Sequence, residues 1–185
     1  MQTLKQKYQK DIAAKLSPEF GLKNILAVPR LKKAVLNVGL NASNRDPKLP
    51  ETVQTVLGRI TGQRPVAALA KKSISNFKIR EGMVVGYRVT LRGARMYDFV
   101  ERLVHVVLPR VRDFRGISEK NVDAQGNLSI GFREHLAFPE VRPEEIEKVH
   151  GLEVTLVTDA KSRARGLALF RAIGVPFQAE EKKNS

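Results

Sequence analysis

The feature that most constrains the fold is an alternation of apolar and polar residues over 84–92, VVGYRVTLR. Every second residue is large and apolar: Val85, Tyr87, Val89 and Leu91. The residues between them are small or polar: Gly86, Arg88, Thr90 and Arg92. Because successive residues of a strand point to opposite faces of a sheet, this segment predicts a half-buried strand. Such a strand is typical of an antiparallel sheet that helices cover on one side only.

A second segment, 34–40, shows the same alternation. Its apolar face has Leu36, Val38 and Leu40, and its opposite face has Val35, Asn37 and Gly39. The open face of the sheet is therefore expected to carry Asn37, Arg88, Thr90 and Arg92, with glycines that let another backbone come close. This face has two interpretations: an ordinary solvated sheet surface, or a surface that contacts the phosphates and 2′-hydroxyls of RNA.

The rest of the chain predicts elements in an order typical of the α+β class. Helices are expected at 1–17, 50–61, 95–112 and from Asp159, as N-cap, to Gly174, with a short helix from Pro143. Pro109 is expected to bend or end the third of these helices. Strands are expected at 31–40, 65–70, 84–92, 128–134 and 152–158. We therefore predict one domain, 1–178, and a polar tail, 179–185. The sheet should be mixed or mostly antiparallel, with about five strands and with helices packed on one face.

The net charge is +14, and it is concentrated in the first half of the chain. Residues 1–92 carry 18 Lys and Arg against 5 Asp and Glu, a net charge of +13, whereas residues 93–185 carry +1. This asymmetry points to a polyanionic partner, above all a nucleic acid. A peripheral membrane protein is an alternative, but it needs a basic helix with a broad apolar face. The apolar stripe of the N-terminal helix is narrow, so we expect it to pack against the domain, and we predict no membrane partner. The stripe consists of Leu4, Tyr8, Ile12 and Leu16.

A basic loop is predicted at 71–84, which begins KKSISNFKIREG. Its cations can contact phosphates: Lys71, Lys72, Lys78 and Arg80. Neutral hydrogen bonds can come from Ser73, Ser75 and Asn76. Phe77 can stack on a nucleotide base or pack back onto the domain. A structureless loop of about a dozen residues tends to be functional in a compact domain, although a soluble surface loop is the alternative.

The sequence offers no convergent catalytic site. It contains no cysteine, which excludes thiol catalysis, disulfides and Cys-ligated metals. His105, His135 and His150 are isolated in the sequence and lack the spacing of metal ligands, and no glycine-rich phosphate cradle occurs. We therefore predict a protein without catalytic activity, metal or cofactor. A free-standing RNA-processing or RNA-modifying enzyme is the alternative.

Motifs along the chain carry a resemblance to a known family: KKSISNFKIREG, VTLRGARMYDF, LPRVRDFRG, GNLSIGFREHLAFPE and GLEVTLVTDA. In their order and spacing, the chain resembles the bacterial large-subunit ribosomal protein five family from about residue 4 to Phe177. The resemblance implies an α+β protein of the cytoplasmic ribosome that binds 5S rRNA and helps attach it in the central protuberance. It also implies contacts with 23S-type rRNA, P-site tRNA, neighbouring large-subunit proteins and small-subunit ribosomal protein thirteen.

The resemblance assigns residues to three surfaces. The rRNA surface has Asn37, Gln63, Thr90 and Arg92, with Lys71 and Lys72 at its edge, and the alternation adds Arg88. The loop that contacts tRNA has Ser75, Asn76, Phe77, Lys78, Ile79 and Arg80. The intersubunit bridge has Asp113, Phe114, Arg115 and Gly116, together with the segment from Arg133 to Pro143, which includes Arg142. Ala68 and Leu69 stand where the family usually has Thr and a basic residue, so RNA contacts at these two positions are not carried over.

Overall fold

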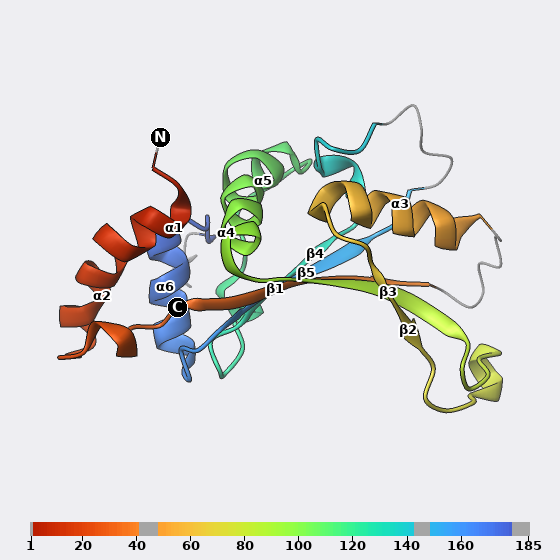
Figure 1. Ribbon diagram of the computed structural model, residues 1–185, viewed down its shortest axis with the longest axis horizontal. Coiled ribbons are helices and arrows are strands. Elements are labelled where there is room, and N and C mark those ends of the chain that lie inside the picture. Colours follow the sequence, from red (N-terminus) through yellow and green to blue (C-terminus); the bar gives the residue numbers. More distant parts are fainter. Residues whose placement is uncertain (1, 41–47, 143–148, 179–185) are drawn as a thin grey trace, which may run out of the picture. The chain divides into compact units, whose positions relative to one another are not determined.

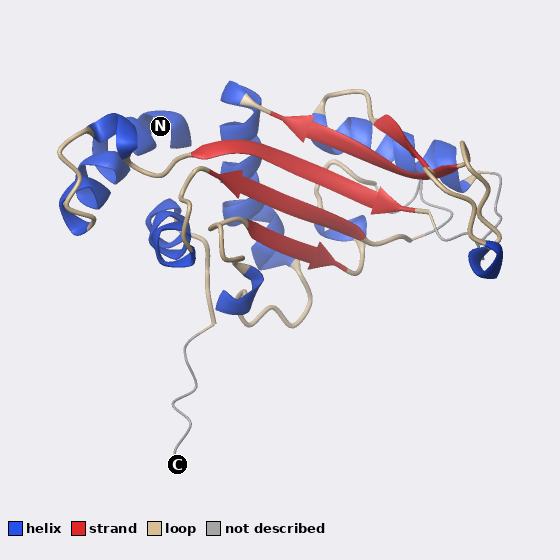
Figure 2. Cartoon of the chain, turned by 90° about the horizontal axis from the view of Figure 1, so that it is seen from below, coloured by secondary structure: helices blue, strands red, loops and turns tan. Residues whose placement is uncertain are grey.

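A computed structural model describes residues 2–40, 48–142 and 149–178 of the chain (Figure 1). The short helix expected from Pro143 and the polar tail expected at 179–185 lie outside these residues. The described chain has the predicted α+β fold, with a five-stranded sheet in the order β2-β3-β1-β5-β4. Neighbouring strands run antiparallel (Figure 2). The strands are β1 (Leu31–Gly39), β2 (Val66–Leu69), β3 (Val84–Leu91), β4 (Leu128–Phe132) and β5 (Leu152–Thr158).

Helices occur where the apolar periodicity predicts them. The α-helices are α1 (Leu4–Lys7), α2 (Ala13–Glu19), α3 (Leu49–Thr61), α4 (Gly93–Arg102), α5 (Leu108–Arg110) and α6 (Arg163–Ile173). Two π-helical turns, Tyr8–Ile12 and Leu103–Val107, join α1 to α2 and α4 to α5. Short 3-10 turns occur at Ile25–Ala27, Ser75–Phe77, Glu119–Asn121 and His135–Ala137. The helix that contains Pro109 ends at Arg110, as predicted.

The chain forms two compact units, which are described separately. The first unit comprises Met1–Ala34, Arg92–Ile130 and Thr155–Ser185. The second unit comprises Val35–Leu91 and Gly131–Val154.

In the first unit, the N-terminal helix packs through the predicted stripe. Leu4, Tyr8, Ile12 and Leu16 are all buried. A four-residue spacing drifts around an α-helix by about 40° per step. The π-helical turn Tyr8–Ile12 holds more residues per turn, so it turns the stripe back to one side. The helix lies against α4, and the Leu4 N–H donates to Glu101 Oε2 at 3.1 Å. The stripe is therefore part of the protein core, as expected.

The prediction that Asp159 caps the last helix is wrong. The N-cap of α6 is Ser162, whose Oγ accepts from the Arg165 N–H at 3.4 Å. Asp159 lies too far upstream, because Lys161 with φ 60° turns the chain before the helix begins. The Asp159 carboxylate instead accepts from the Arg30 N–H at 2.7 Å and pairs with the side chains of Arg30 and Lys32 at 3.4 and 3.2 Å. It therefore ties the end of β5 to the start of β1.

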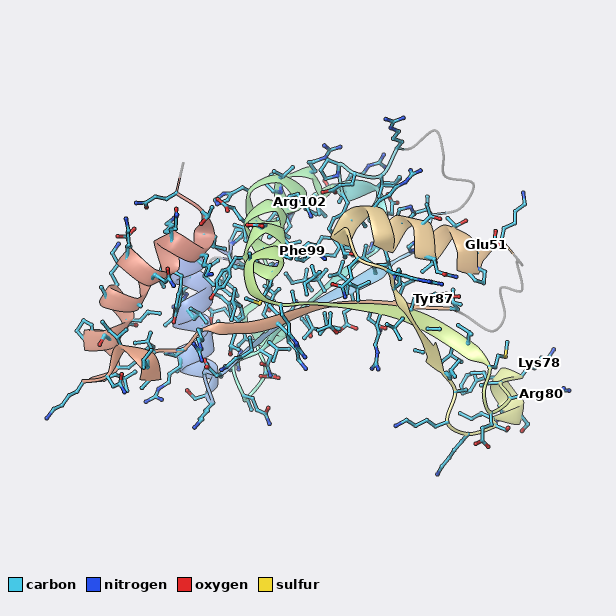
Figure 3. The ribbon with its side chains drawn as sticks, viewed as in Figure 1. Glu51, Lys78, Arg80, Tyr87, Phe99 and Arg102 are labelled. Carbon is cyan, nitrogen blue, oxygen red and sulfur yellow. The ribbon has the colours of Figure 1, made fainter. Side chains whose placement is uncertain are left out.

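In the second unit, α3 covers the apolar face that the alternation predicts. The buried face of α3 has Val53, Val56, Leu57 and Ile60, and Gly62 with φ 64° ends the helix. This helix lies against β3, which carries Tyr87 (Figure 3). Gln54 Nε2 of the helix donates to the hydroxyl of Tyr87 at 2.9 Å. Most of the predicted apolar positions of both strands are buried, namely Leu36, Val38, Tyr87, Val89 and Leu91, whereas Leu40 and Val85 are half-buried. Among the described residues of this unit, no helix lies on the opposite face of β1 and β3 (Figure 1).

Candidate RNA interface

The polar face of β1 and β3 brings together several residues of the predicted rRNA surface. The Leu40 N–H donates to the Val85 carbonyl at 2.8 Å, and this antiparallel register places Asn37 beside Arg88. Both side chains are exposed. On the other side of Arg88, the paired residue of β2 is Val66. A guanidinium and an amide thus occupy neighbouring positions on the face of the sheet that α3 does not cover.

Gln63 and Thr90 are also joined in this unit. The Gln63 side chain follows the end of α3 and donates from Nε2 to the Thr90 carbonyl at 3.3 Å. The Thr61 hydroxyl accepts from the Gln63 N–H at 3.3 Å, which fixes the turn that carries Gln63. The side chains of Gln63 and Thr90 remain partly exposed. Arg92, the first residue after β3, is exposed and belongs to the first unit, where it is the N-cap residue of α4.

The expectation that glycines on this face admit a foreign backbone is wrong for Gly86. This residue is buried, and a Cβ at its position would lie 2.6 Å from the Val38 carbonyl oxygen. The close approach is therefore made by β1 of the same sheet. Gly39 is different, because a Cβ there would meet no atom within 4 Å. Of the two glycines, only Gly39 leaves open space on the polar face.

The basic loop is an ordered hairpin, so the prediction that it lacks structure is wrong. Backbone hydrogen bonds continue the β2–β3 ribbon from Ala70 to Met83 (2.8 Å) and from Gly82 to Ala70 (2.9 Å). Farther out, Ile74 and Ile79 form an antiparallel bridge around the 3-10 turn Ser75–Phe77. Lys78, which follows this turn, adopts a left-handed conformation with φ 53°. The sequence does not predict these local hydrogen bonds, because the segment has no alternation of apolar and polar residues.

The tip of the hairpin presents its cations and its aromatic ring to solvent. Phe77 is 65% exposed, so it does not pack back onto the rest of the protein. The side chains of Lys78 and Arg80 extend from the tip (Figure 3). Lys71, Lys72, Ser75 and Asn76 are exposed as well, and Ile79 is half-buried. The Oγ of Ser73 accepts from the Glu81 N–H at 2.9 Å, and its exposed hydroxyl can still donate a hydrogen bond, as predicted for this residue.

The residues predicted for the bridge lie in both units. In the first unit, Asp113 with φ 52° and Gly116 with φ 96° form a turn after α5. Asp113 and Arg115 are exposed, and Phe114 and Gly116 are half-buried. In the second unit, Arg133 and Arg142 are exposed, each at one end of the segment 133–142.

His135 and His150, which are fifteen residues apart in the sequence and were predicted to be isolated, form a stacked pair in the second unit. Their ring centroids are 4.1 Å apart with planes at 20°, and the His135 N–H donates to the His150 carbonyl at 3.2 Å. His135 is fully buried, and burial lowers the pKa of both imidazoles. The contact closes a loop between β4 and β5. Because the two histidines are fifteen residues apart, no helical or strand periodicity in the sequence predicts that they meet.

This pair does not make a metal site. The lone pair of an imidazole nitrogen lies in the plane of its ring, so two stacked rings do not aim their lone pairs at one ion. Among residues 2–40, 48–142 and 149–178, no group of three or more His, Asp or Glu side chains could hold a metal. Over the same residues, no helix is both long and apolar enough to span a bilayer.

Known proteins match the chain over nearly its whole length. Residues 84–177 match the family model for the C-terminus of the ribosomal L5 family, and residues 24–80 match the one described as Ribosomal protein L5. The large ribosomal subunit protein uL5 of Halothermothrix orenii is 49% identical over 177 residues, 96% of this chain and 99% of the relative. The same-named proteins of Heliobacterium modesticaldum and Leptospira biflexa are 49% and 44% identical and cover 97% of this chain. The alignments include 100% and 98% of those two relatives. These matches confirm the resemblance predicted from the motifs.

Proposed function

Because the chain belongs to the ribosomal protein L5 family, we propose that it is a non-catalytic structural constituent of the large ribosomal subunit that binds 5S rRNA. Family membership also confirms the predicted location in the cytoplasmic ribosome. The protein binds and positions 5S rRNA without a cofactor or metal, and it helps attach this RNA in the central protuberance. Other partners of the protein are 23S-type rRNA and neighbouring large-subunit proteins.

The polar face of β1 and β3 binds the 5S rRNA. The observation that carries this proposal is the pair of exposed side chains, Asn37 and Arg88, on a sheet face that α3 leaves uncovered. A guanidinium binds phosphate oxygens, and amide and hydroxyl groups can contact the 2′-hydroxyls that distinguish RNA from DNA. The other residues of this surface are Gln63, Lys71, Lys72, Thr90 and Arg92.

The hairpin contacts the P-site tRNA with the residues of its tip, Ser75, Asn76, Phe77, Lys78, Ile79 and Arg80. The support for this role is the combination of exposed cations with a backbone that is already ordered by its own hydrogen bonds. The backbone of the hairpin therefore loses little conformational entropy when it binds. The exposed ring of Phe77 gives the tip a surface for stacking on a base or ribose.

The bridge to small-subunit ribosomal protein thirteen uses Asp113, Phe114, Arg115 and Gly116 of the first unit, and Arg133 and Arg142 of the second. The support is the exposure of the charged members of both groups. Exposed charges at the rim of a protein–protein contact act mainly on the rate and orientation of encounter.

A salt titration of binding to 5S rRNA tests the proposal, with a structured RNA of the same length and unrelated sequence as competitor. Each phosphate contact should add about 0.7–0.9 to the slope of log affinity against log salt. We expect the binding of 5S rRNA to survive the competitor. Arg88→Gln should reduce the magnitude of the slope by about 0.7–0.9, the share of one phosphate contact. Equal affinity for both RNAs would reduce the protein to a general polycation and contradict the assignment of the sheet face.

A second measurement addresses the alternative of a free-standing RNA-processing enzyme. On a sucrose gradient, the protein should follow the large subunit after a high-salt wash. Recovery mainly in the free fraction would contradict the structural role.

A further inference from the structure

We infer that the C-terminal segment 176–178 positions the turn 112–116, and that the docking of this turn at the subunit interface depends on that segment. The two lie side by side within the first unit and are joined by backbone hydrogen bonds. The inference rests on the proposed function at one point, the assignment of the turn to the intersubunit bridge.

On its N-terminal side, the turn is fixed by the end of α5. The Val111 N–H donates to the Leu108 carbonyl at 3.2 Å and closes the last helical turn. Two residues later, Asp113 adopts a left-handed conformation with φ 52°, which is uncommon for a residue other than glycine. Asp adopts this conformation more readily than most residues do, and contacts on both sides of the turn add to its stability.

On its C-terminal side, the turn is held by 176–178. The Ile117 N–H donates to the Pro176 carbonyl at 2.8 Å, and the Gln178 N–H donates to the Ile117 carbonyl at 3.0 Å. These bonds make a parallel bridge between Ile117 and Phe177. Ile117 is almost fully buried, so the bridge is protected from water on this side.

Gly116 shows how closely the two backbones approach. A Cβ at this position would lie 2.7 Å from the Gln178 nitrogen and 2.8 Å from the Phe177 carbonyl carbon. Its φ of 96° is also a conformation that side-chain-bearing residues rarely adopt. Glycine is therefore required here for two separate reasons, and one of them is the presence of the C-terminal segment.

The residues after the bridge are held by α6, which leads into the same C-terminal segment. Glu119 forms an ion pair with Arg171, and Arg163 Nη2 donates to the Glu119 carbonyl at 2.9 Å. Anchors from the C-terminal part of the chain thus hold the backbone from Ile117 to Glu119. Only residues 112–116 lie between the two fixed ends, and so short a span has few conformations.

The turn displays charged groups in this fixed geometry. Arg112, Asp113 and Arg115 are exposed. A partner that meets a rigid turn avoids the entropic cost of ordering it on binding. Without the C-terminal segment, the contacts of Ile117 would be lost and the nearest anchor on the C-terminal side of the turn would be Glu119, so a partner would have to order a longer span. The predicted rRNA surface should be spared, because all of its residues except Arg92 belong to the second unit.

A matched pair of variants of the full chain tests this inference. Gln178→Pro removes the N–H that donates to Ile117, whereas Gln178→Ala keeps it and removes only the exposed side chain. A second pair consists of chains that stop after Val175 or after Gln178, and only the first of these lacks the segment 176–178. Each variant is assayed for tryptic cleavage after Arg112 and Arg115, for 5S rRNA binding, and for the joining of reconstituted large subunits to small subunits.

We expect Gln178→Pro and the chain that stops after Val175 to be cleaved at least about fivefold faster after Arg112 and Arg115, since cleavage follows the population of the open turn. Both should join small subunits more weakly and bind 5S rRNA normally. The two controls, Gln178→Ala and the chain that stops after Gln178, should match the wild type in every assay. Equal cleavage of Gln178→Pro and Gln178→Ala would overturn the positioning role. Faster cleavage with normal subunit joining would support the positioning role and overturn the bridge assignment of the turn.

Discussion

The Gly86→Ala variant should destabilise the protein through one steric contact. The added Cβ would lie 2.6 Å from the Val38 carbonyl oxygen and 3.4 Å from the Gly39 Cα, and both atoms belong to the backbone of β1. Neither atom can rotate away as a side chain can, so β1 and β3 must move apart. Overpacking of this kind costs about 1–3 kcal/mol of the free energy of unfolding.

Gly39→Ala is the matched control, because this glycine lies on the paired strand and its Cβ would meet no atom within 4 Å. That variant should be neutral or more stable by up to about 1 kcal/mol, since alanine restricts the unfolded chain. For a chain of 185 residues, each kcal/mol shifts Tm by roughly 2–4 °C. We therefore expect Gly86→Ala to lower Tm by about 2–12 °C in a calorimetric scan.

The same substitution should weaken 5S rRNA binding at temperatures where the variant is still folded. The contact between Gly86 and Val38 belongs to the register that places Asn37 beside Arg88, so separating the strands changes the spacing of these side chains. The reasoning is refuted if Gly86→Ala melts within experimental error of the wild type. It is equally refuted if Gly39→Ala loses as much stability as Gly86→Ala.

Three further predictions concern the stacked histidines, the hairpin and the Asp159 contacts. Because burial lowers the pKa of His135, its contribution to stability should be constant above the unfolded value of 6.5 and fall below it, by at most about 1.4 kcal/mol per pH unit, and His150 should add a fall of the same sign. Denaturant unfolding between pH 5.5 and 7.5 measures this, and a His135→Phe variant with an unchanged slope would contradict it. Ser73→Ala should speed amide exchange at Glu81 severalfold, since about 0.5–1.5 kcal/mol of local stability is lost, and leave 5S rRNA binding unchanged. Asp159→Asn, which loses only partly exposed ion pairs, should cost under about 1 kcal/mol. Asp159→Ala should lower the free energy of unfolding by about 1–3 kcal/mol, because the Arg30 N–H also loses its acceptor. Equal losses for Asp159→Asn and Asp159→Ala would show that this hydrogen bond contributes nothing beyond the ion pairs.

Local patterns in the sequence predicted most of the fold. Burial imposes a period of two on β1 and β3 and a helical period on α3 and α4, and these periods are visible along the chain. The apolar and polar faces of the sheet, the helix ends at Gly62 and Arg110, and the motifs of the family all followed from residues close together in sequence.

The errors have a common cause, because each involves a partner that is distant in sequence or a bond without periodicity. Asp is a residue type that often caps helices, but the partners of Asp159 are Arg30 and Lys32, which lie more than 120 residues earlier in the chain. His135 and His150 stack only because β4 and β5 bring the two ends of a loop together.

The sequence by itself determined the α+β class, the faces of the strands, the family and the excess of positive charge, because these depend on local periodicity, on motifs and on composition. Only the tertiary structure decided which close approaches are made within the protein. It showed that β1 covers Gly86, that the hairpin is ordered by its own backbone, and that the segment 176–178 holds the turn at Gly116. Such contacts join backbone atoms of distant segments, and backbone atoms leave no pattern in the side chains.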